Sequence, residues 1–106
     1  MKDKTIYVMH SNICKVLANP IRIEIIDVIG EKEMSFKEIQ EATGVLKSNL
    51  SQHLSNMVVS GILTQRKEGT SVFFKLSTYK VAKACKIMRE VLIENLKKTQ
   101  KIIDVK

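Results

Sequence analysis

The sequence predicts a mainly α-helical fold with a single β-hairpin, in the order α-α-α-α-β-β-α. Three observations support it. Apolar residues recur at helical spacing along most of the chain. Capping signals mark two helix starts, at Asn19-Pro20 and at Ser35. Two short apolar runs flank a turn at Gly69. The 106 residues, 44% of them hydrophobic and none a tryptophan, predict one domain over residues 1–106 with an aliphatic core.

The first part of the chain predicts two helices. Over residues 3–17 the apolar side chains fall on one helical face, which consists of Ile6, Met9, Ile13, Val16 and Leu17. A second helix begins at Asn19-Pro20, because asparagine caps helices and proline suits their first turn. It runs to about Ile29 and stops at Gly30. Ile23, Ile26 and Ile29 form one face of this helix, and Ile25 and Val28 widen it, so it is expected to be buried on most sides.

The remaining elements follow from similar signals. Ser35 to Glu38 is a capping box that opens a short third helix, which ends at Thr43-Gly44. A fourth helix is predicted over 47–60, with Leu50, Leu54, Met57 and Val58 on its inner face. The runs 62–66 and 71–76 predict the two strands of the hairpin. The last helix covers 78–102, and its apolar face consists of Val81, Ala84, Cys85, Met88, Val91 and Leu92.

The charge of the chain points to a polyanionic partner. The formal net charge is +7, and residues 1–46 carry 6 basic and 7 acidic groups. Residues 47–76 carry 4 and 1, and residues 77–106 carry 8 and 3, so the basic excess begins at Lys47. Two cysteines are too few for a disulfide framework. We expect no signal peptide, no membrane span, and a cytoplasmic protein with reduced thiols.

Two short helices joined through Gly44 predict a helix-turn-helix motif, whose second helix enters the major groove of DNA. On the fourth helix, the side opposite its apolar residues consists of Ser48, Gln52, Ser55 and Val59, with Asn49 and Ser51 on the flanks. This helix contains one cation, Lys47, and no acid, so its polar face suits hydrogen bonds to bases or phosphates. The alternative is a serine-rich surface helix without a partner. His53 lies nearer the apolar side, where a structural hydrogen bond and a DNA contact are equally expected.

The hairpin carries Arg66 and Lys67 before its tip and Lys75 on its return strand, as expected for a wing that touches the DNA backbone. The alternative is an ordinary charged turn. The predicted DNA contacts are therefore Lys47, Ser48, Asn49, Ser51, Gln52, His53, Ser55, Arg66 and Lys67.

These segments resemble one family over about residues 10–98. Leu17-Ala-Asn-Pro-Ile-Arg-Ile is similar to the opening of the second helix in the ArsR/SmtB family of winged helix-turn-helix repressors. Ser48-Asn-Leu-Ser-Gln-His-Leu resembles its recognition helix, and Gly61-Ile-Leu, Arg66-Lys-Glu-Gly and Phe73-Phe-Lys-Leu resemble its wing. The resemblance implies a homodimer joined through its first and last helices. Such a dimer would bind a palindromic double-stranded operator as a repressor and be released by an inducer.

The sequence lacks the ligands of the family's common metal sites. Residues 35–46 contain no cysteine, and residues 77–106 contain no histidine, so we expect neither a metal nor another cofactor. Cys14 and Cys85 leave three interpretations: two small buried hydrophobic residues, a thiol switch linked to redox or sulfur species, or a thiol pair that holds a soft metal. The family's sulfide-responsive members place one cysteine late in the second helix, where this chain has Asp27.

The sequence therefore favours a sequence-specific DNA-binding transcriptional regulator. An enzyme is not expected, because the chain has no nucleophile elbow, phosphate loop, metal-ligand cluster or catalytic pair. The alternative function is a winged-helix module that binds proteins and not DNA. Such modules would have an acidic or apolar face in place of the neutral polar face predicted on the fourth helix.

Overall fold

The computed structural model of the protein describes residues 3–104, with side chains described up to residue 100. The elements in chain order are α1 (Thr5–Leu17), α2 (Pro20–Ile29), β1 (Met34–Ser35), α3 (Phe36–Thr43), α4 (Lys47–Val59), β2 (Leu63–Glu68), β3 (Ser71–Leu76) and α5 (Lys80–Asp104). The predicted helices and hairpin strands are all present in the predicted order. The mainly α-helical fold with a β-wing is therefore confirmed.

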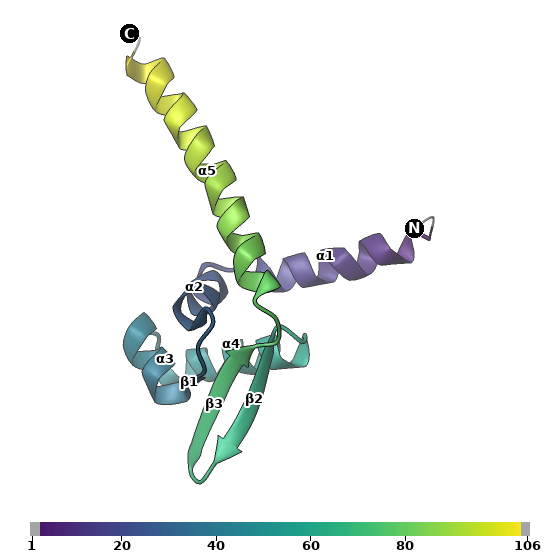
Figure 1. Ribbon diagram of the computed structural model, residues 1–106, viewed down its shortest axis with the longest axis vertical. Coiled ribbons are helices and arrows are strands. Elements are labelled where there is room, and N and C mark those ends of the chain that lie inside the picture. Colours follow the sequence, from purple (N-terminus) through teal and green to yellow (C-terminus); the bar gives the residue numbers. More distant parts are fainter. Residues whose placement is uncertain (1–2, 105–106) are drawn as a thin grey trace.

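The molecule consists of a packed body and two helical arms. Helices α2, α3 and α4 and the sheet form the body, and α1 and α5 diverge from one side of it (Figure 1). The wing, formed by β2 and β3, projects from the opposite side. The molecule measures 60 × 41 × 23 Å along its principal axes. None of the described helices combines the length and hydropathy that a bilayer span requires.

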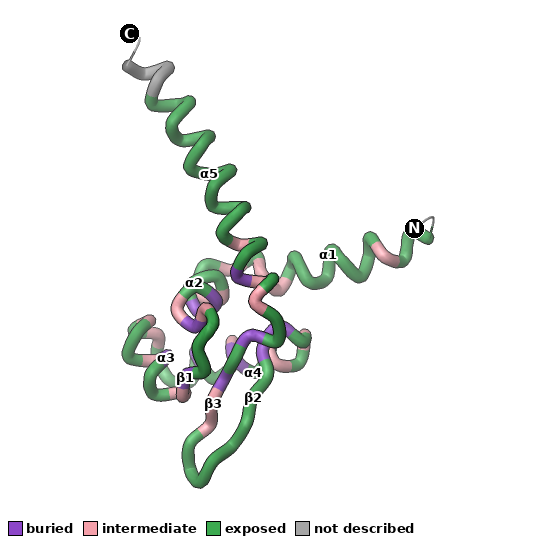
Figure 2. Tube along the Cα trace, viewed as in Figure 1, coloured by how far each residue is buried: buried purple, intermediate pink, exposed green. Residues whose placement is uncertain are grey.

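The core lies where α2 packs against its neighbours, and almost all of the arms are exposed (Figure 2). Thirteen described hydrophobic residues form it: Ile25, Ile26, Ile29, Met34, Ile39, Leu50, Leu54, Met57, Ile62, Leu63, Phe74, Leu76 and Ala82. The inner face predicted for α2 needs one correction. Ile25 is fully buried, whereas Ile23 is 37% exposed and faces the space between the arms. Among the described residues, the apolar faces of α1 and α5 are largely exposed and are not fully covered by the rest of the chain.

The turn between α3 and α4 depends on local signals. The Ser35 hydroxyl accepts a hydrogen bond from the Glu38 backbone N–H (3.1 Å), and the Ser35 backbone N–H donates to the Glu38 carboxylate (2.9 Å), so the predicted capping box forms. Gly44 ends α3 with φ 71°, a left-handed conformation that glycine adopts without a steric penalty. Helix α4 begins after Leu46 and crosses the body beside the wing.

The wing belongs to a sheet of three antiparallel strands in the order β1-β3-β2. β2 pairs with β3 from Leu63↔Leu76 to Glu68↔Ser71, and β1 pairs with β3 through Met34↔Phe74 and Ser35↔Phe73. The sequence predicts only the hairpin. β1 was missed because its two residues are too few to show the alternation that identifies a strand.

Candidate nucleic-acid interface

Helix α4 is buried on one side and presents polar residues on the other. Leu50, Leu54 and Met57 are in the core, which fixes the orientation of the helix. The predicted contact residues Lys47, Ser48, Asn49, Ser51, Gln52 and Ser55 are all exposed. The helix therefore offers solvent a neutral hydrogen-bonding surface with one cation at its start, as the sequence predicts.

His53 is the exception among the predicted contact residues on α4, because it is half-buried. Arg22 of α2 donates a hydrogen bond from Nε to His53 Nδ1 at 3.0 Å and another from Nη1 to the Val16 backbone oxygen at 3.2 Å. Partial burial, and then the charge of Arg22, lower the pKa of His53. The structure thus provides the structural hydrogen bond that was one of the two expectations for His53. Arg22 connects the end of α1 to α4.

A groove of about 670 Å³ lies between α4 and the wing. Lys47, Ser51 and Ser55 line it from α4, and Gln65, Thr70 and Ser71 line it from the wing. Lys37, near the start of α3, also lines the groove and was missed by the sequence analysis. Lys37 lies within residues 1–46, which have no basic excess, so the charge distribution does not indicate a DNA contact there. The capping box was the one sequence signal that could have indicated it, because it places Lys37 in the first turn of α3.

The two predicted wing cations lie on opposite faces of the sheet. Side chains alternate along a strand, so Lys67 shares a face with Gln65, which lines the groove, and Arg66 points to the other face. Lys67 is exposed. The register therefore places Lys67, and not Arg66, on the side of the wing that faces α4.

Arg66 is held by partners within the chain. Its Nε donates to both carboxylate oxygens of Glu33 (3.0 and 2.9 Å), its Nη2 donates to Glu33 (2.7 Å), and its Nη1 donates to Glu68 (2.7 Å). The guanidinium also stacks on the Phe73 ring, 4.5 Å from its centroid. Hydrogen bonds to Glu33 and then to Glu68 raise the pKa of Arg66, and the bond from Arg66 lowers the pKa of Glu33. Two carboxylates already neutralise this cation in the free protein, which argues against the phosphate contact predicted for Arg66.

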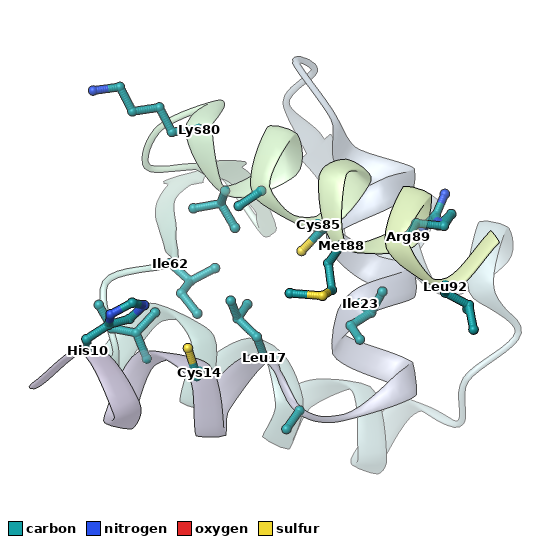
Figure 3. Close-up of a pocket in the computed structure, with 14 residues that line it drawn as sticks. His10, Cys14, Leu17, Ile23, Ile62, Lys80, Cys85, Met88, Arg89 and Leu92 are labelled. Carbon is teal, nitrogen blue, oxygen red and sulfur yellow. The ribbon is translucent and has the colours of Figure 1, made fainter. Parts of the chain in front are cut away.

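A second cavity, of about 720 Å³, lies between the two arms. Its lining is mostly apolar and includes Ile13, Leu17, Ile23, Ile62, Met88 and Leu92. Cys14 of α1 and Cys85 of α5 line the same cavity, and their sulfur atoms point into it from opposite sides (Figure 3). Cys14 is exposed and Cys85 is half-buried, and burial raises the pKa of the Cys85 thiol. Within the described part of the chain, no three His, Cys, Asp or Glu side chains are grouped to hold a metal ion.

Comparisons with known proteins agree with this geometry. The family model of a helix-turn-helix domain matches residues 17–66. The uncharacterised HTH-type transcriptional regulator Rv0081 of Mycobacterium tuberculosis is 28% identical over 93 residues, which are 87% of this chain and 82% of that protein. The crystal structure of Rv0081 has a TM-score of 0.80 at 26% identity and covers 92% of this chain and 98% of that one.

Two further proteins, one matched by sequence and one by structure, are also similar to this chain. The biofilm growth-associated repressor of Xylella fastidiosa is 31% identical over 72 residues, which are 68% of this chain and 63% of that protein. The homodimeric winged helix-turn-helix DNA-binding domain Mb0332 of Mycobacterium bovis, described as a possible ArsR-family regulator, has a TM-score of 0.76 at 26% identity and covers 91% of this chain and 90% of that one.

The fold, the exposed polar helix beside a wing and these matches define a winged helix-turn-helix protein. As its sequence predicts, the chain is similar to winged helix-turn-helix transcriptional regulators, one of which is described as a possible member of the ArsR family. Proteins of this class are generally not enzymes.

The partial burial of His53 beside the charge of Arg22 predicts a pH dependence of stability. Because the folded state lowers the pKa of His53, the unfolded chain binds the proton more readily. The stabilisation is complete above the unfolded pKa of about 6.5 and is lost as the pH falls below it, by at most about 1.4 kcal/mol per pH unit. Urea unfolding at pH 7.5 and pH 5.5 measures this loss.

His53→Asn should reduce the loss, because the asparagine oxygen replaces the Nδ1 acceptor and does not titrate. His10→Gln, at an exposed histidine of α1, is the matched control and should leave the loss unchanged. A wild-type loss that persists in full in His53→Asn would contradict this assignment.

Proposed function

We propose that this regulator is a repressor that binds a palindromic double-stranded operator as a homodimer. One observation carries the proposal: α4 exposes a polar face without any acid, beside a groove lined by Lys37 and Lys47 and a wing that carries Lys67. Uncharged polar groups can hydrogen-bond base edges, and lysines attract phosphates. Ser48, Asn49 and Gln52 are assigned to the bases. Lys37, Lys47 and Lys67 are assigned to the backbone, with Ser51 and Ser55 between them.

The exposed apolar residues of the two arms support the homodimer. On α1 they are Tyr7, Val8, Met9 and Ile13, and on α5 they are Ile87, Met88, Val91, Leu92, Ile93 and Leu96. Exposed apolar surface of this extent on two neighbouring helices is typical of a protein interface. The Mycobacterium bovis relative is homodimeric. A dimer joined by these arms would place two copies of α4 about one DNA turn apart, roughly 34 Å.

Selection of bound sequences from a random duplex pool tests the proposal. The expected result is an inverted repeat whose half-sites lie about one turn apart. Affinity for the selected duplex should fall steeply as salt increases, because bound cations displace counterions. The absence of any selected sequence, together with no measurable duplex binding at low salt, would favour the winged-helix module that binds proteins.

Gln52 should read a base. Gln52→Ala is expected to weaken binding to the selected operator by about 1–3 kcal/mol, because a bidentate contact between its amide and a base is lost, and to leave binding to an unrelated duplex unchanged. Asn56→Ala is the matched control. Asn56 is also an exposed amide, but it lies one turn closer to the helix end, whereas base edges are contacted by the N-terminal part of the recognition helix. Equal losses on both duplexes would refute base reading by Gln52.

The two wing cations should behave differently. Lys67→Ala should weaken binding to all duplexes alike and flatten the dependence of log affinity on log salt by about one unit, because one phosphate contact is lost. Arg66→Ala should leave that slope unchanged, because Glu33 and Glu68 already neutralise Arg66. Filter-binding titrations at four salt concentrations give both slopes. The assignment fails if Arg66→Ala flattens the slope as much as Lys67→Ala does.

We further propose that Cys14 and Cys85 form the inducer-responsive element, since both sulfur atoms point into the cavity between the arms. Hydrogen peroxide would take two electrons and two protons from the thiols and leave as water, and a Cys14–Cys85 disulfide would form. A disulfide requires Cα atoms within about 7 Å, so it would fix α1 and α5 in one relative position. We propose that this position differs from the one that places both copies of α4 on the operator.

Peroxide should therefore link the two cysteines and lower operator affinity. Peptide mass spectrometry identifies the link, and titration of the operator measures the loss. Cys85→Ser should bind the operator like the wild type and lose the response. A response that persists in the Cys14→Ser, Cys85→Ser double variant would exclude the switch.

A further inference from the structure

Leu46 is an unusual residue at the start of α4. It occupies the N-cap position in extended conformation (φ −60°, ψ 143°) and makes no side-chain capping hydrogen bond. Its side chain is 77% exposed. By contrast, Asn19 caps α2 and Ser35 caps α3 through their side-chain oxygens. The protein thus caps the two preceding helices and leaves α4, the proposed recognition helix, uncapped.

Leucine at this position stabilises neither the helix nor the core. Serine, threonine, aspartate and asparagine are preferred at the N-cap, because they satisfy backbone N–H groups of the first turn. The proposed dimer does not explain the exposure of Leu46 either. Among the described residues, the large exposed hydrophobic side chains lie on α1, α2 and α5, except for Leu46 and Val59 at the two ends of α4. The described structure thus gives no reason for a leucine at position 46. This residue lies directly before Lys47 and Ser48.

The proposed mode of DNA binding provides an apolar partner for Leu46. The N-terminal residues of a recognition helix contact base edges in the major groove. In that groove thymine presents its C5-methyl group, which is recognised by apolar contact. We infer that Leu46 packs against the methyl group of one thymine in each operator half-site. It is thus a specificity-determining residue, and this inference rests on the proposed operator binding.

Val59 provides a matched control. It is 84% exposed, so it is at least as accessible as Leu46. It lies 13 residues further along, at the last position of α4, which corresponds to roughly 20 Å at the helical rise of 1.5 Å per residue. A residue at that distance cannot contact the base that faces Leu46. An effect of general surface hydrophobicity would appear in variants of both residues.

The test removes single methyl groups from the DNA. Each thymine of the selected operator is replaced in turn by deoxyuridine, which lacks only the C5-methyl group, and affinity is measured for the wild type, Leu46→Ala and Val59→Ala. At one thymine per half-site, methyl removal should weaken wild-type binding by about three- to fivefold, the size expected for one buried methyl group. The same replacement should have almost no effect on Leu46→Ala. Val59→Ala should respond like the wild type.

A second variant separates recognition from folding. Leu46→Ser supplies a capping hydroxyl, so its thermal midpoint should rise by roughly 4–8 °C while its sensitivity to the thymine methyl disappears. The inference is overturned if no thymine shows a methyl effect that depends on Leu46, or if Val59→Ala abolishes the same effect. Failure of the wild type to bind any duplex would instead refute the proposed function.

Discussion

The structure depends on the burial of α2. Ile25, Ile26 and Ile29 are almost fully buried, and this helix contacts α1, α3, α4, α5 and the sheet. Removal of such side chains from water is the dominant favourable term in folding, and close packing fixes how the surrounding helices are oriented. Arg22 adds a directional link, since its guanidinium binds both the end of α1 and His53 of α4. This short helix therefore helps to fix the position of α4 relative to the arms.

This arrangement separates two kinds of surface. α4 and the groove side of the wing present polar and basic groups on the body, whereas the arms present apolar groups away from it. The ion pairs of Arg66 with Glu33 and Glu68 stabilise the wing next to β1 and leave Lys67 available on the groove side. A change between the arms can reach α4 through α2, or through Ile62, which lines the cavity and donates a backbone hydrogen bond to Met57 of α4. The cavity that contains both thiols adjoins α2 at Ile23.

Local signals made most of the fold predictable. The caps at Asn19 and Ser35, the glycine at position 44 and the helical spacing of apolar residues each act within a few positions, so they are visible in the sequence. Features formed between distant residues were missed. Arg66 meets Glu33 across 33 positions and Arg22 meets His53 across 31, and no local pattern indicates such partners. The polar face of α4 was predictable because the same periodicity that buries Leu50 exposes Gln52. That Lys67 faces the groove and Arg66 the opposite side depends on the strand register, which was not predicted from the sequence.

In the proposed complex, two copies of α4 bind one duplex from the same side. Hydroxyl-radical footprinting of the selected operator measures this most directly, because it reports which sugars of each strand the protein covers. We expect two protected segments on one face of the DNA helix, with centres about 10 base pairs apart. A single protected segment, or uniform protection along the whole duplex, would contradict this arrangement.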